Sequence, residues 1–205
     1  MTHLTKPVYK RLFFLPILFI TLFHISCKPN REPRKIDRAF YYWKSVLHIS
    51  PVELAALDSL HVNRLYVKYF DVDWNEVTAE PYPVARLQLI NFRMPEKFTV
   101  IPTVFITNEC IQKIDSSKTD LLAANINRLI QQITDTNHLR TEKEIQIDCD
   151  WTASTQKTYF ALLQKIKDHW KAAAVIVSAT IRLHQIKFMR KTGVPPADKG
   201  LLMCY

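Results

Sequence analysis

Short apolar runs recur along this chain, and their alternation with polar residues predicts strands separated by helices. Residues 99–106 are almost continuously apolar, as expected of a strand that is covered on both faces. Residues 144–149 alternate instead, with Ile145, Ile147 and Cys149 on one face. The complete set of predicted strands is 39–43, 64–70, 99–106, 144–152, 174–181 and 200–205.

Between these strands the apolar spacing changes to that of helices. Ser50, Pro51 and Glu53 form a helix start, with a serine cap, proline at the first helical position and an acid at the third. Residues 75–97 are expected to form a long loop with one short helix or strand. Strands that alternate with helices predict parallel βαβ units. The expected helices cover residues 51–60, 120–134 and 154–173.

Polar side chains fall at the carboxyl-terminal ends of the predicted strands. In a (β/α)8 barrel these ends form one face, which carries the active site. Each residue taken alone is better explained as a solvated strand end, but their coincidence at five strands favours a common site. We therefore expect an α/β fold, a partial (β/α)8 TIM barrel of about six strands. The residues concerned are Asp71, Asp73, Asn108, Glu109, Asp148, Asp150, His184, Gln185 and Tyr205.

Two acids stand close together in the fourth predicted strand. Gln146, Asp148 and Asp150 share one face, and two carboxylates two residues apart repel each other. Either they sit at a solvated strand end, or they face a polar cavity in which their charge is useful. Asp150 is our candidate general acid or base, with Asp148 raising its pKa by like-charge repulsion.

The residues around this pair resemble a known signature. Ile147-Asp148-Cys149-Asp150-Trp151 is similar to the fourth-strand motif of family 18 glycoside hydrolases, the chitinase-like (β/α)8 barrels. Leu202-Met203-Cys204-Tyr205 is similar to their sixth-strand motif. The resemblance implies that Asp148 and Asp150 match the two aspartates that precede the catalytic glutamate, and that Tyr205 lines the sugar subsite.

The chain departs from that family pattern at two positions. Thr152 stands where the family has its glutamate, and Ile145 stands where it has its first aspartate. Because threonine cannot donate the proton that the leaving glycosidic oxygen needs, the usual chitinase mechanism does not follow from this sequence.

Three functional hypotheses remain open. The first is a carbohydrate-active enzyme that uses Asp148 and Asp150, the second is a non-catalytic barrel that binds glycan or another envelope partner, and the third is a fragment without independent activity. Asp71 is a further candidate for substrate binding. Core packing is the competing explanation for each tryptophan. The candidate sugar platforms are Trp43, Trp74, Trp151 and Tyr205, and the candidate hydrogen-bonding partners are Arg182, His184 and Gln185.

The amino-terminal segment predicts export and anchoring. A basic stretch precedes an apolar run over residues 12–25, which is too short to span a bilayer and typical of a secretory signal. The run ends in Ser26-Cys27 and resembles a bacterial lipoprotein signal, although His24 replaces the usual leucine. We expect a signal peptide over 1–26, a lipid on Cys27 and a tether over 27–37. The alternative is a plain signal peptide or short anchor in which Cys27 is an incidental thiol.

Composition narrows the possible chemistry. The only glycines are Gly193 and Gly200, so the sequence contains no glycine-rich loop of the kind that binds phosphate or a dinucleotide. No cofactor is expected. The net charge of +9 is spread along the chain without a basic stripe, which argues against nucleic-acid binding and fits a bacterial envelope surface.

The cysteines show no metal-ligand spacing. Cys149 and Cys204 lie in apolar runs and are expected to be buried. Cys110 follows Asn108-Glu109 at a predicted strand end and is the thiol to test for reactivity.

The length of the chain limits the barrel. A complete (β/α)8 barrel takes about 250 residues, whereas this chain has 205. We expect residues 38–205 to form a truncated barrel domain whose first and last strands have open edges.

Overall fold

The structure is a computed structural model that describes residues 36–204. The unit that begins at Arg38 carries all of the elements described below. The expected signal peptide, the proposed lipidation site Cys27 and the candidate subsite residue Tyr205 lie outside the described residues.

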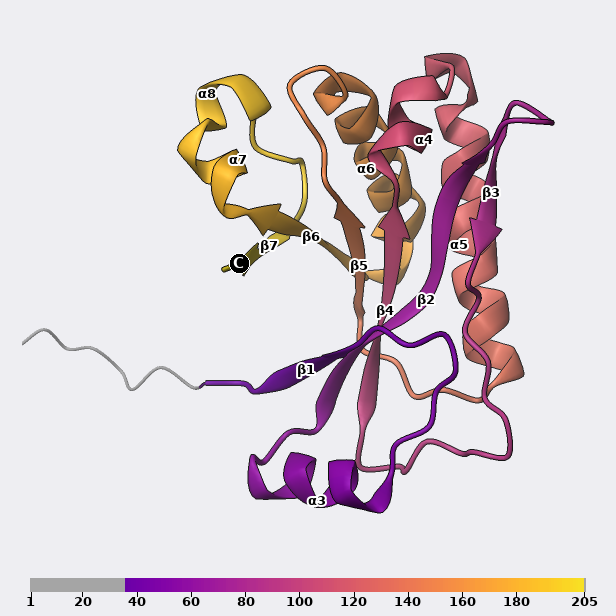
Figure 1. Cartoon of the computed structure of the whole chain (residues 1–205), viewed down its shortest axis with the longest axis vertical. Helices are drawn as coiled ribbons and strands as arrows, with labels where there is room; N and C mark the ends of the chain where they lie inside the picture. The colour runs from indigo at the N-terminus through magenta and orange to yellow at the C-terminus, as the bar shows by residue number, and fades with distance from the viewer. Residues whose placement is uncertain (1–35, 205) are drawn as a thin grey trace, which may run out of the picture. The chain divides into compact units, whose positions relative to one another are not determined.

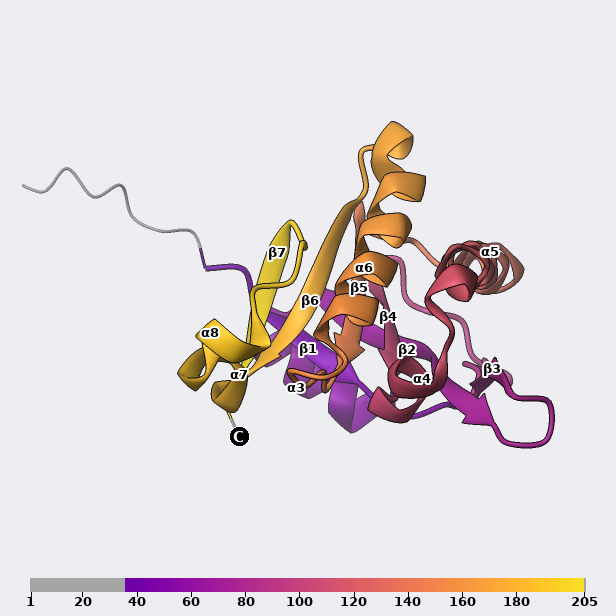
Figure 2. The same cartoon turned by 90° about the horizontal axis from the view of Figure 1, so that it is seen from above.

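The chain forms a mixed α/β fold around one curled sheet (Figures 1 and 2). Six parallel strands follow the order β1-β2-β4-β5-β6-β7, and β3 pairs antiparallel with β2. The parallel strands make a half-barrel, with α5 and α6 outside the arc. The strands are β1 (Ala39–Tyr42), β2 (Arg64–Asn75), β3 (Glu80–Val84), β4 (Thr99–Ile106), β5 (Glu144–Cys149), β6 (Ile176–Arg182) and β7 (Lys199–Met203).

The helices confirm the predicted alternation with the strands. The expected start of α3 is present: the Ser50 hydroxyl accepts from the Glu53 amide, and the Glu53 carboxylate accepts from the Ser50 amide. Short helices that the sequence pattern missed follow β4 and β6. The helices are α3 (Pro51–Ser59), α4 (Asn108–Lys113), α5 (Thr119–Thr136), α6 (Gln156–Trp170), α7 (Leu183–Lys187) and α8 (Met189–Thr192), with 3-10 turns at Ser116–Lys118 and Lys171–Ala173.

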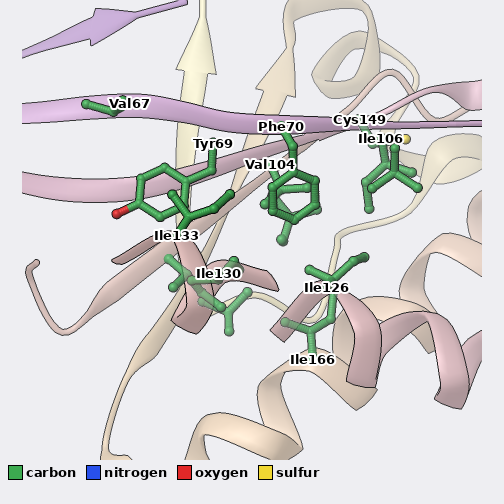
Figure 3. Close-up of a cluster of buried hydrophobic side chains, with 14 of the residues drawn as sticks. Val67, Tyr69, Phe70, Val104, Ile106, Ile126, Ile130, Ile133, Cys149 and Ile166 are labelled. Carbon is green, nitrogen blue, oxygen red and sulfur yellow. The ribbon is translucent and has the colours of Figure 1, made fainter. Parts of the chain in front are cut away.

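The hydrophobic core lies between the convex face of the sheet and the helices. Figure 3 shows side chains of β2, β4 and β5 packed against α5 and α6. The Tyr69 hydroxyl lies 3.2 Å from the Thr134 hydroxyl on α5. Burying each large apolar side chain here contributes about 1.5–3 kcal/mol. The residues labelled in this layer are Val67, Tyr69, Phe70, Val104, Ile106, Ile126, Ile130, Ile133, Cys149 and Ile166.

A β-bulge in β2 changes which residues face the helices. The pairing with β4 shifts register between Lys68 and Phe70, so the consecutive residues Tyr69 and Phe70 both lie in the convex core. Beyond the bulge, Asp71 therefore takes the concave face, where its carboxylate accepts a 3.0 Å hydrogen bond from Lys68.

Several sequence expectations need correction. The second strand does not end at Phe70 but runs to Asn75, because β3 pairs with its second half and extends it. Asp71 and Asp73 consequently lie within a strand and not after one. The apolar spacing of residues 120–134 predicts Leu121 on the buried side of the helix, but Leu121 is 63% exposed.

The structure corrects the expectation for Cys204 and shows that Cys110 is inaccessible. Cys110 is fully buried because it lies in α4, which contacts β2 and α6, whereas Cys204 is exposed. Cys149 is buried as expected.

Candidate functional site

The concave face of the half-barrel carries polar side chains in register. Parallel pairing sets Lys68, Thr103, Gln146 and Ser178 side by side on β2, β4, β5 and β6. Paired residues of neighbouring strands point to the same side of a sheet, so this row crosses the concave face. A hydrophobic barrel interior would need apolar residues here, whereas Thr103, Gln146 and Ser178 are fully buried and polar. The concave face is therefore the place to look for binding chemistry.

Asp148, Asp150 and Arg182 meet at the carboxyl-terminal ends of β5 and β6. The Arg182 guanidinium donates through Nε to Asp150 and through Nη2 to Asp148, the latter at 3.2 Å. The Thr180 hydroxyl also donates to Asp148. The carboxylates predicted from alternation thus share one cation, which offsets much of their mutual repulsion.

The two carboxylates differ in their surroundings. The Asp148 side chain is 4% exposed, and that of Asp150 is 51% exposed. Burial raises the pKa of Asp148 above its usual range; the hydrogen bond from Thr180 and the charge of Arg182 oppose this rise, and the charge of Asp150 adds to it. The raised pKa belongs to Asp148, the carboxylate that the sequence argument treated as the neighbouring charge. Asp148 is the group that holds a proton more readily than a free aspartate.

Aromatic rings extend the concave face from β1. The Trp43 ring stacks on Tyr41 at 5.3 Å with an interplanar angle of 8°, and Tyr41 packs on Tyr66 at 4.9 Å. The Tyr41 hydroxyl donates to Gln146 Oε1 at 2.7 Å. Trp43 is 39% exposed. Trp43 is therefore an accessible ring at one end of an aromatic stack. The Tyr41 hydroxyl connects this stack to Gln146, which stands two residues before Asp148 on β5.

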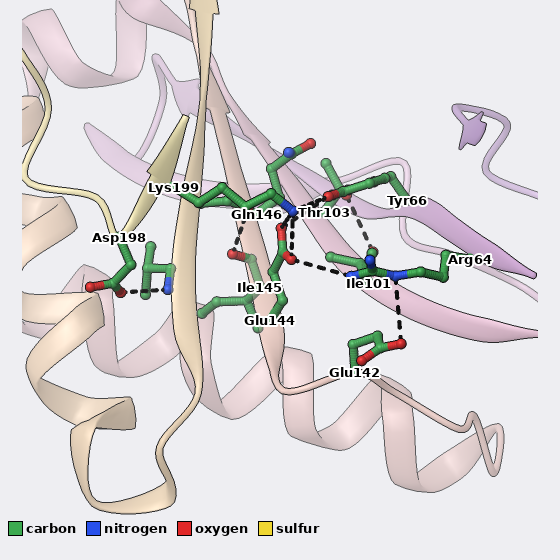
Figure 4. A network of polar contacts seen from close by, with 12 residues as sticks. Arg64, Tyr66, Ile101, Thr103, Glu142, Glu144, Ile145, Gln146, Asp198 and Lys199 are labelled. Atoms are coloured by element: carbon green, nitrogen blue, oxygen red, sulfur yellow. Dashed lines mark hydrogen bonds and ion pairs between the residues drawn. The ribbon is translucent and has the colours of Figure 1, made fainter. Parts of the chain in front are cut away.

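A second polar cluster lies at the opposite end of the strands (Figure 4). Glu144 is buried and accepts hydrogen bonds from Lys199 at 3.0 Å and from Tyr66 at 3.0 Å. Arg64 lies 3.7 Å from the same carboxylate, on its other side. Each charged side chain of this cluster lies next to one of opposite charge within it, so we regard the cluster as a structural support for the curl of the sheet.

Asp71 and Asp73 do not join the Asp148 cluster. Asp71 is paired with Lys68, and its Oδ1 atom is buried with no hydrogen-bond partner among the described residues. Asp73 accepts from the Thr107 hydroxyl and the Trp74 amide, at the start of α4. Asp73 therefore stabilises the turn between β4 and α4. One carboxylate oxygen of Asp71 accepts no hydrogen bond from the described residues.

Trp151 and Gln185 have packing roles in the structure. Trp151 is fully buried, stacks on Tyr159 and donates its indole N–H to the Thr192 carbonyl at 2.9 Å. Gln185 is 2% exposed; it accepts from the Arg182 amide and donates to the Trp151 carbonyl. Neither side chain presents a surface to a ligand, and our expectation of direct sugar contacts is replaced by a role in holding α7. The reason is that Gln185 of α7 and Thr192 of α8 are hydrogen-bonded to Trp151, in the loop that follows β5.

The remaining candidates are placed as follows. Arg182 joins the carboxylates, as expected of residues at the ends of adjacent strands. His184 is exposed on α7, and Trp74 is partly buried against the core. Thr152 is exposed, and its hydroxyl lies 2.8 Å from that of Ser154, in the loop before α6. No carboxylate replaces the missing glutamate at this position.

Sequence reasoning missed Thr180, Tyr41 and Lys68. A signal for Thr180 existed, since it stands two residues before Arg182 and shares its strand face. Tyr41 could not be distinguished from core packing in an aromatic strand, and the bulge in β2 hid the pairing of Lys68 with Asp71. Within residues 36–204, no group of three or more His, Cys, Asp or Glu side chains is placed to hold a metal ion.

No family model and no curated protein matches the chain. Among solved structures, it is similar to a chitinase from Chromobacterium violaceum ATCC 12472, with 10% identity and a TM-score of 0.43. The match covers 82% of this chain and 56% of that chain, so the present chain spans little more than half of the chitinase's length.

Proposed function

We propose that the concave face binds carbohydrate at the ends of β5 and β6, and that the half-barrel is part of a (β/α)8 barrel of the glycoside-hydrolase type. One observation carries the proposal: the accessible Trp43 stack lies on the same sheet face as Asp148 and the Arg182 pair. Sugars present apolar C–H faces beside rings of hydroxyl groups. A flat aromatic surface next to planar, charged hydrogen-bonding groups suits both parts of such a ligand.

Binding is better supported than hydrolysis. A glycosidase needs one carboxylic acid that donates a proton and one carboxylate that acts as base or nucleophile. The exposed carboxylate, Asp150, is paired with Arg182, while the more protonatable Asp148 is buried. Thr152 cannot replace the missing acid. The alternatives are an enzyme with Asp150 and Asp148 as its catalytic pair, and an inactive fragment.

A glycan array together with a panel of chromogenic glycosides separates these possibilities. We expect binding to a subset of glycans, weakened tenfold or more by Trp43→Ala, because the stacking surface is lost. Trp74→Phe is the matched control, since Trp74 is partly buried against the core. Hydrolysis that disappears in Asp150→Asn would establish the enzyme. Binding that is unchanged in Trp43→Ala would contradict the proposed subsite, and no binding at all would support the inactive fragment.

We further propose that the protein is a lipoprotein of the bacterial envelope, anchored through Cys27. The support is the apolar run over 12–25 followed by Ser26-Cys27. Metabolic labelling with palmitate should mark the chain, and Cys27→Ser should abolish the label, whereas Cys204→Ser should leave it. Label that survives Cys27→Ser would remove the lipoprotein proposal. In the described part of the chain, the helices are too short or too polar to cross a bilayer.

A further inference from the structure

The segment formed by α7 and α8 has an inverted distribution of polar and apolar side chains. Its buried side chains are the polar residues Gln185, 2% exposed, and Thr192, 6% exposed. Its large apolar side chains point outward, with exposed fractions between 47% and 66%. These are Leu183, Ile186, Phe188, Met189 and Val194. Folding normally buries the apolar side of such a segment, so the exposed side chains form a surface, here called the α7–α8 surface.

Specific hydrogen bonds fix this orientation. The Thr192 hydroxyl donates to the Gln185 carbonyl at 2.9 Å, and the Thr192 carbonyl accepts from the Trp151 indole. The Gln185 amide donates to the Trp151 carbonyl at 3.1 Å. Because these hydrogen bonds anchor the segment to the buried Trp151, rotation of the apolar residues into the core would break this network. The α7–α8 surface is therefore built to face outward.

The charges on the α7–α8 surface have one sign. Lys187, Arg190 and Lys191 are exposed, and the sequence from Leu183 to Ala197 contains no acid. Lys187 Nζ lies 5.4 Å from the centre of the Phe188 ring. Among residues 36–204, none of the three cations forms an ion pair with a carboxylate. The first acid after the segment, Asp198, is engaged by Lys167 and by the Val177 amide.

We propose that the α7–α8 surface docks on an anionic phospholipid membrane. Interleaved cations and apolar side chains match the negative headgroups and the acyl boundary just beneath them. A protein partner of the same shape would need its own acidic and apolar pattern, whereas an anionic bilayer supplies both generically. Figures 1 and 2 show α7 and α8 beyond the end of β6, apart from α5 and α6. The carbohydrate proposal and a lipid on Cys27 are not needed for this inference.

The full chain carrying Cys27→Ser, which has no lipid, tests the surface by co-sedimentation with vesicles. We expect tighter binding to phosphatidylcholine vesicles that contain phosphatidylglycerol than to phosphatidylcholine alone. Each basic residue near an anionic surface strengthens binding roughly fivefold, so Arg190→Gln with Lys191→Gln should weaken it about 25-fold. Lys143→Gln with Lys171→Gln removes the same charge from exposed positions elsewhere, and this double variant should weaken vesicle binding by less than about fivefold.

The apolar contribution has its own matched pair of variants. Phe188→Ser should weaken vesicle binding several-fold, whereas Leu121→Ser, at an exposed position on α5, should not. Hydrogen exchange of the vesicle-bound chain locates the contact: the amides of residues 183–194 should exchange more slowly with phosphatidylglycerol present. Equal affinities of parent and variants together with unchanged exchange would overturn the proposal. Self-association without vesicles, abolished by Phe188→Ser, would instead identify a second copy as the occupant and also overturn it.

Discussion

Lys199 Nζ lies 3.0 Å from the Tyr66 hydroxyl oxygen, although three strands separate β7 from β2 in the sheet. In a flat sheet these strands would be roughly 19 Å apart, farther than the two side chains could reach together. Their contact therefore requires the curl of the half-barrel. Glu144, on the intervening strand β5, accepts hydrogen bonds from both residues and joins them from below.

Lys199→Met should destabilise the curled sheet. It leaves the Glu144 carboxylate buried, with Tyr66 and the more distant Arg64 as its remaining partners. Because Lys199 is 39% exposed and Arg64 stays, we expect a loss of about 1–3 kcal/mol, below the usual cost of breaking a fully buried pair. Urea unfolding measures it. In the double variant with Glu144→Gln the losses should not add, and simple additivity would contradict this coupling.

Asp148→Asn should change how stability depends on pH. The folded-state pKa of Asp148 is raised, chiefly by burial, so the folded chain binds the proton more tightly than the unfolded chain does. Wild-type stability from this group is fully present below the unfolded pKa, near 4, and is lost as pH rises through the raised pKa. In Asp148→Asn the side-chain oxygen still accepts the hydrogen bond from Thr180, and the stability no longer falls as pH rises through the raised pKa.

Urea unfolding at a series of pH values above 4 measures that difference. The stability of Asp148→Asn relative to wild type should rise with pH across this window. Asp168→Asn, which changes an exposed carboxylate on α6, is the control and should show no such trend. A relative stability that falls with pH would mean that Arg182 outweighs burial at Asp148.

Sequence periodicity predicted most elements but not the contacts between them. β4 was predicted at its observed bounds, because its apolar run is a local property, whereas the strand predicted over 144–152 ends at Cys149 and leaves Asp150 just beyond it. Tyr41 reaches the site through strand pairing, which no local pattern contains. Trp151 was misjudged because its ring packs on Tyr159 and Phe160 of α6 and its indole donates to Thr192 of α8, a four-residue helix too short for a periodic signal.

Gly193→Ala should destabilise the end of α8. Gly193 has φ +71°, and an added Cβ would lie 2.0 Å from Gln156 Nε2. Strain and clash together should cost about 1–3 kcal/mol. Gly200→Ala is the matched control, since there the Cβ meets the end of the flexible Ile181 side chain at 2.7 Å, which can move. Equal losses in chemical denaturation would show that Gly193 carries no special constraint.

Cysteine alkylation should distinguish the exposed thiol from the buried ones. Burial, assisted by the charges of Asp73 and Glu109, raises the pKa of the Cys110 thiol to about 12, so little thiolate forms at neutral pH. In the native chain we expect iodoacetamide to modify Cys204, and Cys110 and Cys149 only after unfolding. Peptide mapping by mass spectrometry assigns the sites. Rapid native labelling of Cys110 would mean that α4 opens readily.

The bulge in β2 divides that strand into two segments, and the positions that tolerate polar substitutions are even-numbered in the first and odd-numbered in the second. Before it, even-numbered positions such as Tyr66 and Lys68 face the polar side, and after it the odd-numbered Asp71 does so. A saturation scan of β2 should therefore show a polar-tolerant periodicity that slips by one position at Tyr69. Deleting Tyr69 would remove the bulge and bring both segments into one phase with Asp71 still on the polar side, so a single lost codon here removes one buried ring without turning a charge into the core.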